Sequence, residues 1–385
     1  MKLSARHQRG TSAPCFCSAH QRPEKMGALF SSPIPEPSAV KAALLAPAAA
    51  APASFEEAAL LPDVRAFLVP MRWLSPLVDS APPWLTRFIM HATLAGKPPA
   101  AGQPPLPGAP PLGETDLSLR GDDGAPLAAR IYEPPHLAGK SAPLVIYIHG
   151  GGWIAGGIET HAPICRVLAS ALGWRVLAVT YRCAPTHQYP AAALDVLAAY
   201  KHIAARGADF GLDAAAPRVV LSGDSAGGQL MLELGLRVRD TPGLLQPTLL
   251  APIVPAVHMR IGDAASFIKY GDGFGLNTKA TRNLIAAYLG ATPELRAKHD
   301  RNAYLSPALR ADFTGVAPIL LLTAEFDILS DDGRAFVKTV NVRGGSAEHM
   351  EAMGNMHACI ATFLPSGLAQ LLKFAARIKD KFNAI

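Results

Sequence analysis

The sequence has few charged residues: only 17% of its 385 positions are Asp, Glu, Lys or Arg, while half are hydrophobic. A chain so poor in charge can bury a substantial core, and its length suits one large α/β domain with a lid or two small domains. No apolar run approaches the roughly 18–20 residues of a membrane-spanning helix. The basic N-terminus also lacks the apolar segment of a secretory signal. These absences argue against a membrane-spanning protein and against secretion through a signal peptide.

Cysteine is also sparse, and an odd, scattered set of five argues against a disulfide framework. Such a set indicates free thiols in a reducing compartment. We therefore expect a cytoplasmic protein, or an organellar one if the basic, serine-containing tail is a transit peptide. The pair at positions 15 and 17 matches no zinc-binding spacing, so no metal site is expected. The cysteines are Cys15, Cys17, Cys165, Cys183 and Cys359.

The formal net charge of +6 is concentrated at one end of the chain. The first 25 residues hold five Lys or Arg against one Glu, which leaves +2 for the remainder. No basic stripe with interleaved aromatic residues is present, so nucleic acid is not expected as a partner. An Ala/Pro-rich, low-complexity composition predicts that residues 1–54 form a disordered tail.

The most informative stretch is a predicted strand-to-helix turn around Ser225. An apolar strand pattern at 218–221 leads into Gly-Asp-Ser-Ala-Gly, and a helical pattern follows. Gly-x-Ser-x-Gly in this setting is typical of a sharp turn that exposes a nucleophilic serine. A Cβ at Gly223 or Gly227 is expected to collide with the neighbouring strand or helix. We predict that Ser225 is the nucleophile and that Asp224 supports the motif.

A second glycine-rich motif, His-Gly-Gly-Gly-Trp at 149–153, follows the apolar run 144–148. Consecutive glycines are costly to order, but they suit a loop whose N–H groups point at a developing negative charge. In acyl transfer one such donor to the oxyanion is worth about 10²–10³ in kcat. We predict that the oxyanion donors are the N–H groups of Gly151, Gly152 and Ala226. The residues expected to hold this loop in place are His149 and Gly150.

These two motifs, with three others in the same order, resemble the hormone-sensitive-lipase family of α/β hydrolases. The resemblance covers roughly residues 60–385 and is carried by 149–153, 181–185, 223–228, 324–333 and His357. Two positions depart from the family pattern. Thr186 stands where a glutamate is common, and Cys183 stands where an apolar residue is common. These departures put in doubt a local salt bridge of the family pattern, and they bear less on catalysis.

The resemblance implies an α/β-hydrolase fold, and strands that alternate with helices indicate a mostly parallel sheet flanked by helices. Eight strands are predicted, at 116–119, 127–132, 144–148, 176–181, 219–222, 248–253, 319–323 and 348–353. Helices are predicted at 164–172, 191–205, 226–238, 281–289, 334–340 and 368–378.

Three regions are predicted from this pattern and from the resemblance. Residues 55–112 are expected to form N-terminal cap helices and a connector, and residues 113–385 the catalytic domain. The interruption at 254–318 is too long for a plain connection, so a second part of the cap is expected at about 255–300. The cap aromatics expected to line the acyl site are Trp73, Trp84, Phe88, Phe267, Tyr270 and Phe274.

A nucleophilic serine needs a histidine base and an orienting carboxylate. Four histidines follow the serine, of which His258 and His299 fall in the predicted cap and His349 lies inside the last strand pattern. His357 follows that strand, at the edge of the sheet where ligands gather, and it matches the family's late histidine. The carboxylates that compete are Glu325, Asp327, Asp331 and Asp332.

The resemblance assigns the acid to Asp327, whereas Asp331 and Asp332 open a helix, where the macrodipole favours a carboxylate. Cys359 is expected to be a buried thiol without a catalytic role. The implied activity is that of a serine carboxylesterase, a lipolytic hydrolase of short- to medium-chain esters that acts through an acyl-enzyme without cofactor or metal. A small ester is the expected partner, and a homodimer is one open assembly state. The alternatives are an amidase or deacetylase, a non-catalytic ligand-binding member of the fold, and a membrane-surface scaffold.

Overall fold

The computed structural model describes residues 60–64, 106–260, 264–272, 274–360 and 364–385. The predicted tail, 1–54, lies outside the described residues, as does most of the predicted cap and connector segment, 55–112. None of the helices in the described ranges is both long and apolar enough to cross a membrane.

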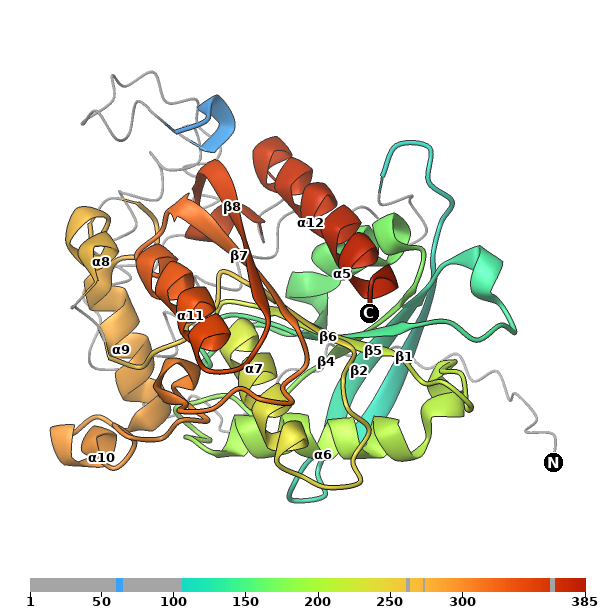
Figure 1. Cartoon of the computed structure of the whole chain (residues 1–385), viewed down its shortest axis with the longest axis horizontal. Helices are drawn as coiled ribbons and strands as arrows, with labels where there is room; N and C mark the ends of the chain where they lie inside the picture. The colour runs from blue at the N-terminus through green and yellow to red at the C-terminus, as the bar shows by residue number, and fades with distance from the viewer. Residues whose placement is uncertain (1–59, 65–105, 261–263, 273, 361–363) are drawn as a thin grey trace, which may run out of the picture. The chain divides into compact units, whose positions relative to one another are not determined.

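Within the described residues, eight strands form one sheet, which confirms the predicted strand number. Their order across the sheet is β1-β2-β4-β3-β5-β6-β7-β8 (Figure 1). Strand β2 runs against both of its neighbours, and every other adjacent pair is parallel. The strands are β1 (Gly113–Arg120), β2 (Pro126–Glu133), β3 (Leu144–Ile148), β4 (Arg175–Val179), β5 (Val219–Asp224), β6 (Leu249–Ile253), β7 (Ile319–Phe326) and β8 (Ala347–Met356).

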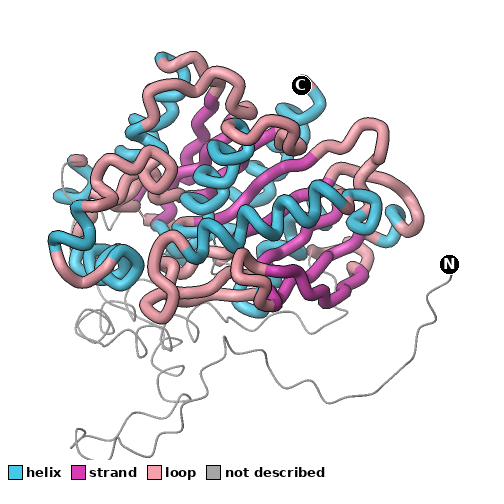
Figure 2. Tube along the Cα trace, turned by 90° about the horizontal axis from the view of Figure 1, so that it is seen from below, coloured by secondary structure: helices cyan, strands magenta, loops and turns pink. Residues whose placement is uncertain are grey.

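Helices cover both faces of the sheet because its central strands are apolar on both sides. In β3 every residue is buried, with Leu144, Ile146 and Ile148 in one core cluster and Val145 and Tyr147 in the other. Such near-continuous apolar strands are typical of a sheet covered on both faces. Figure 2 shows helices crossing over the strands.

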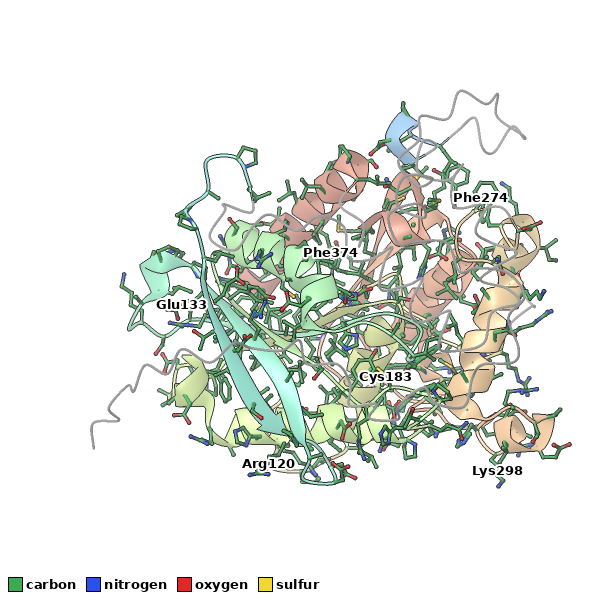
Figure 3. The ribbon with its side chains drawn as sticks, turned by 180° about the vertical axis from the view of Figure 1, so that it is seen from behind. Arg120, Glu133, Cys183, Phe274, Lys298 and Phe374 are labelled. Carbon is green, nitrogen blue, oxygen red and sulfur yellow. The ribbon has the colours of Figure 1, made fainter. Side chains whose placement is uncertain are left out.

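Two groups of helices supply these cores. Helices α5 (Ile158–Leu172) and α12 (Pro365–Asn383) pack on one face, where Phe374 is fully buried (Figure 3). Residues of α6, α7 and α11 fill the core on the other face. These three helices span Ala191–Ala205, Ala226–Arg239 and Ser330–Val342. Short 3-10 helices are η1 (Pro135–Leu137), η2 (Gly207–Phe210), η3 (Pro307–Leu309) and η4 (His357–Ile360).

The described residues of the interruption between β6 and β7 form three helices, α8 (Ala265–Lys269), α9 (Thr278–Leu289) and α10 (Pro293–Ala297). The side chain of Asn277 caps α9 by accepting a hydrogen bond from the N–H of Ala280 at 2.7 Å. This cap explains why α9 begins three residues before the apolar periodicity that predicted it. The apolar face of α9 is buried through Leu284, Tyr288 and their neighbours.

Candidate active site

The turn between β5 and α7 holds Ser225 in a strained backbone conformation, with φ 53° and ψ −117°. A non-glycine residue adopts such a geometry only when its surroundings enforce it. The flanking glycines make the turn possible: a Cβ at Gly223 would lie 2.5 Å from the carbonyl oxygen of Ile148, and one at Gly227 would lie 2.1 Å from it. The collision predicted from the sequence is therefore confirmed.

Three side chains form a continuous hydrogen-bonded line at the carboxyl ends of β5, β7 and β8. Nε2 of His357 lies 2.9 Å from Oγ of Ser225, and Nδ1 of His357 lies 2.7 Å from Oδ2 of Asp327. The other oxygen of Asp327 accepts a hydrogen bond from the N–H of Leu329 at 3.0 Å. Both oxygens of Asp327 accept hydrogen bonds, and its side chain is buried. The carboxylate therefore holds the imidazole of His357 with Nε2 directed at Ser225.

The pKa of His357 is shifted by opposing effects. Burial lowers it, but the carboxylate of Asp327 and its hydrogen bond outweigh burial and bring the pKa above the ordinary value of 6.5. A more basic imidazole is better suited to take a proton from a serine hydroxyl.

The other candidate acids lie apart from this line. Glu325 accepts a hydrogen bond from the N–H of Gly354 at 2.8 Å. Asp331 lies in the first turn of α11, as predicted, where it pairs with Arg334 at 2.6 Å. Asp331 also accepts a hydrogen bond from the N–H of Ser266 at 2.8 Å, so it ties α8 to α11. Asp332 lies in the same first turn.

The other late histidines are also placed elsewhere. His349 lies within β8 and its Nε2 is 2.8 Å from Oγ1 of Thr323, while burial lowers the pKa of His349. His299 packs edge-on against Tyr189, with ring centroids 5.0 Å apart. His258 accepts a hydrogen bond from the N–H of Arg260 and lies at the wall of the cavity beside Ser225.

The glycine motif turns through left-handed backbone angles, and its Gly152 lines the same cavity as Ser225. Gly151 has φ 112° and Gly152 has φ 60°, which glycine adopts readily. A Cβ at Gly150 would lie 2.2 Å from Oδ2 of Asp224, so only glycine permits this approach. The N–H of Gly150 donates to Asp224 at 3.0 Å and thereby joins the glycine loop to the serine turn.

Asp224 is the centre of a buried polar cluster that the sequence did not predict. It accepts a hydrogen bond from the hydroxyl of Tyr147 at 2.7 Å and lies 3.4 Å from Nε2 of His161. Burial by itself would raise the pKa of Asp224, but His161 and the hydrogen bonds bring it down to about 2. Asp224 therefore stays ionised and holds the loop as a charged acceptor.

His149 has the contacts expected of a residue that holds the loop. Its ring stacks on Tyr181 with centroids 4.3 Å apart, and the hydroxyl of Tyr181 donates to its carbonyl oxygen at 3.0 Å. The departures at Cys183 and Thr186 do not remove ion pairing here. Arg182 pairs with the fully buried Asp195 at 2.8 Å and also with Asp123 at 2.7 Å.

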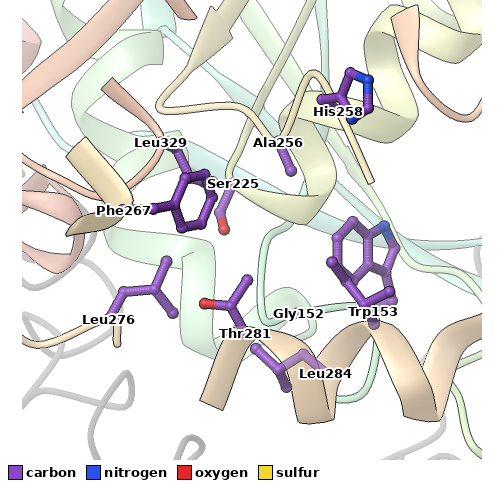
Figure 4. Close-up of a pocket in the computed structure, with 11 residues that line it drawn as sticks. Gly152, Trp153, Ser225, Ala256, His258, Phe267, Leu276, Thr281, Leu284 and Leu329 are labelled. Atoms are coloured by element: carbon purple, nitrogen blue, oxygen red, sulfur yellow. The ribbon is translucent and has the colours of Figure 1, made fainter. Parts of the chain in front are cut away.

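A small cavity of about 20 Å³ lies beside the serine. Figure 4 shows the hydroxyl of Ser225 pointing into the space between Phe267, Thr281 and Leu284. The wall combines the serine turn and the glycine loop with residues of the β6–β7 interruption. Its lining is mostly apolar and consists of Gly152, Trp153, Ser225, Ala256, His258, Phe267, Leu276, Thr281, Leu284, Ile285 and Leu329.

Of the aromatic residues expected to line the acyl site, one lines the cavity, two lie in the core and three lie outside the described residues. Phe267 lines the cavity, as predicted. Tyr270 and Phe274 are not among the lining residues; their rings lie 5.5 Å and 5.7 Å from the ring of Phe326 and form part of the core. The expected residues Trp73, Trp84 and Phe88 lie outside the described residues.

Two further expectations concern cysteines and metals. Cys359 is fully buried, as predicted, and burial raises its pKa to about 12. Cys165 and Cys183 are buried as well and form no disulfide within the described residues, whereas Cys15 and Cys17 lie outside them. Within the described part of the chain, no group of three or more His, Cys, Asp or Glu side chains is arranged to hold a metal ion.

Known proteins are similar to this chain in sequence and in fold. A family model described as the alpha/beta hydrolase fold matches residues 145–361. An arylesterase of Saccharolobus solfataricus is 31% identical over 274 residues, which cover 71% of this chain and 85% of the relative. An ethyl acetate hydrolase of Pseudomonas putida is 32% identical over 251 residues, which cover 63% and 74%. An α/β hydrolase enzyme from the metagenome of Lake Arreo, Spain, has a solved structure that matches with a TM-score of 0.73 and 28% identity, over 85% of this chain and 99% of that one.

Proposed function

Because the chain belongs to the hormone-sensitive-lipase-like family of α/β hydrolases and is a carboxylic ester hydrolase, we propose that Ser225, His357 and Asp327 are its catalytic triad. The observation that carries this proposal is the hydrogen-bonded line from Asp327 through His357 to Ser225 on the strained turn. A hydroxyl within reach of an oriented base is the arrangement that nucleophilic catalysis requires.

Acylation begins when Nε2 of His357 takes the proton of the Ser225 hydroxyl while Oγ attacks the ester carbonyl carbon. The carbonyl oxygen becomes an oxyanion, and the imidazolium is stabilised by the carboxylate of Asp327. The tetrahedral intermediate then collapses: the bond to the alcohol breaks, and His357 gives its proton to the leaving alkoxide. Deacylation repeats these steps with water as the nucleophile and releases the carboxylic acid.

The oxyanion is assigned to the N–H groups of Gly151, Gly152 and Ala226. Ala226 is the first residue of α7, and the N–H groups of a first helical turn lack partners within the helix. The left-handed glycine loop is fixed to the serine turn through the hydrogen bond from Gly150 to Asp224. Donors fixed in this way need no reorganisation as negative charge develops, which is the main source of their effect on the rate.

The substrate preference proposed here is for esters of short to medium acyl chains. The cavity beside Ser225 is small and apolar, and α9 closes it through Thr281, Leu284 and Ile285. We assign residues of about 255–300 to a cap on this basis. Rates should rise with acyl length while the added methylenes find room and then fall, and emulsified long-chain triglycerides should be poor substrates.

A cytoplasmic location is part of the same proposal. It is supported by the three described cysteines, Cys165, Cys183 and Cys359, which are buried and not joined in a disulfide. Free thiols are typical of a reducing compartment.

The test compares two serine variants on a panel of aryl esters of increasing acyl length, with the matching anilides alongside. Ser225→Ala should abolish ester turnover while circular dichroism shows an unchanged fold, because the hydroxyl contributes to the reaction and little to packing. Ser118→Ala, an exposed position on β1, should retain the wild-type rates. Wild-type turnover in a folded Ser225→Ala variant would refute the triad, and faster turnover of anilides than esters would refute the substrate class.

A further inference from the structure

The indole of Trp153 is tied to helix α7 by a buried hydrogen bond. Trp153 directly follows the last glycine of the motif, and its Nε1 donates to Oε1 of Gln229 at 3.0 Å. The same ring stacks on Tyr288 of α9, with centroids 4.9 Å apart and planes 4° from parallel. One side chain therefore connects the glycine loop with α7 and α9.

The backbone of this loop needs such an anchor. Trp153 has a φ of 62°, in the left-handed region that bulky residues rarely adopt, and it follows Gly152 at φ 60°. A residue in this region persists only when its surroundings enforce the conformation. Trp153 is 3% exposed, and its indole is held by the hydrogen bond to Gln229 and by stacking on Tyr288.

The side-chain amide of Gln229 is hydrogen-bonded at both its oxygen and its nitrogen, which gives it a single orientation. It is fully buried, and its Nε2 donates to Oε2 of Glu233 at 3.0 Å and to the carbonyl oxygen of Leu305 at 3.1 Å. Turning the amide over would place N–H groups against the indole N–H and an oxygen against the Glu233 carboxylate. The acceptor that faces Trp153 is therefore specified by the network behind it.

That network ends on an ion pair between the buried Glu233 and the partly buried Arg237. Oε1 of Glu233 accepts hydrogen bonds from Arg237 at 2.7 Å and from the hydroxyl of Tyr189 at 3.1 Å. The Tyr189 hydroxyl in turn accepts from Nδ2 of Asn302 at 2.9 Å. Moving a paired, buried carboxylate is costly, so Glu233 gives Gln229 a rigid support.

We propose that Gln229 is a positioning residue for catalysis, which orients the N–H groups of the glycine loop by holding the indole of Trp153. This inference rests on the proposed function, because it concerns the donors assigned to the oxyanion. Gln229 is predicted to touch neither the substrate nor the reacting atoms. Its effect should therefore fall on the transition state, where the oxyanion forms, and not on substrate binding.

The test is a double-mutant cycle of Trp153→Phe, Gln229→Met and the double variant, measured as kcat and KM on p-nitrophenyl acetate. Trp153→Phe keeps a ring that can stack on Tyr288 but removes the donor, and Gln229→Met removes the acceptor at similar volume. Each single variant should lower kcat about 10-fold or more, as expected for a small misplacement of catalytic groups. Gln229→Met should leave KM nearly unchanged, because Gln229 is not among the residues that line the cavity. The double variant should be no slower than the slower single variant, since both changes break one interaction.

Matched controls carry the same substitutions elsewhere. Gln246→Met, at a glutamine whose Nε2 bonds only to nearby main-chain oxygens, and Trp174→Phe, beside Phe382, should keep the wild-type kcat. Multiplicative losses in the double variant would overturn the proposal. A Trp153→Phe variant with wild-type kcat, or with a changed KM alone, would overturn it too, even if Gln229→Met does not fold.

Ser225→Ala, assayed in parallel, separates this proposal from the proposed function. Loss of turnover in Ser225→Ala together with independent effects of Trp153 and Gln229 would refute the positioning role alone. Retained turnover in Ser225→Ala would refute the triad, and the positioning role with it.

Discussion

At the scale of single residues, the serine turn depends on contacts that leave no room for a side chain. We predict that Gly227→Ala destabilises the protein by about 1–3 kcal/mol, as overpacking does, because its Cβ would lie 2.1 Å from the carbonyl oxygen of Ile148. Chemical denaturation measures this loss directly. Gly113→Ala is the control, since the nearest atom to its Cβ would be 3.6 Å away. Equal stability of the two variants would show that the turn tolerates a side chain.

A second prediction concerns the charge of Asp327. Asp327→Asn should lower kcat by up to about 10⁴, because the amide no longer selects the reactive imidazole tautomer. The wild-type rate should rise with pH through a midpoint above 6.5, since the neutral imidazole is the base and its folded-state pKa is raised. Without the carboxylate this midpoint should move to lower pH. Both effects are read from kcat/KM profiles.

Asp331→Asn is the matched control for that substitution. It removes charge from a residue that pairs with Arg334 and Ser266 and should cost a few tenths to about 1 kcal/mol of stability, with little kinetic effect. A larger kinetic loss in Asp331→Asn than in Asp327→Asn would show that Asp331, and not Asp327, is the catalytic acid.

The serine and the histidine of the candidate triad were predicted from the motif and from chain order, and the resemblance to the family assigned the acid to Asp327. The sequence did not predict the partners of Asp224 and Trp153. Tyr147 lies 77 residues from Asp224 in the chain, and Gln229 lies 76 residues from Trp153. Such pairs depend on how the strands and helices pack, and no local pattern encodes them.

At the scale of elements, α9 sets the space next to the serine. The side chain of Leu284 lies against Gly152, since a Cβ at that glycine would be 2.7 Å from Cδ1 of Leu284. Leu284→Ala should shift the optimum toward longer acyl chains, by about 0.8 kcal/mol or roughly fourfold in kcat/KM for each methylene that the new space admits. A series of p-nitrophenyl esters measures this shift.

Ile268→Ala removes a branched side chain of the same interruption at a position that is 82% exposed. This control should leave the acyl-length profile unchanged. An unchanged profile in Leu284→Ala as well would show that α9 does not bound the acyl site.

Helices and strands with a long periodic segment were predicted from the sequence, and the shortest helices were not. Helix α6 spans the predicted residues 191–205, and all eight strands lie within a few residues of their predicted ranges. Helices α8 and α10 have five residues each, too few for a helical period to be recognised. Helix α5 begins at Ile158, six residues before its predicted start, and includes Pro163 in its second turn.

At the scale of the whole molecule, the N-terminal tail should be dispensable for catalysis. Its Ala/Pro-rich sequence has no periodic apolar face with which to dock on the catalytic domain. Deletion of residues 1–50 should therefore leave kcat/KM for short-chain esters nearly unchanged. A large loss in a folded truncated protein would show that the tail contributes to the cap.

In the proposed mechanism, ester hydrolysis proceeds through an acyl group on Ser225. The most direct measurement is mass spectrometry of the enzyme quenched during turnover of p-nitrophenyl acetate, followed by peptide mapping. We predict one acetyl group per chain, on the peptide that contains Ser225, and none in Ser225→Ala. An acetyl group on another residue, or steady turnover in Ser225→Ala, would contradict this mechanism.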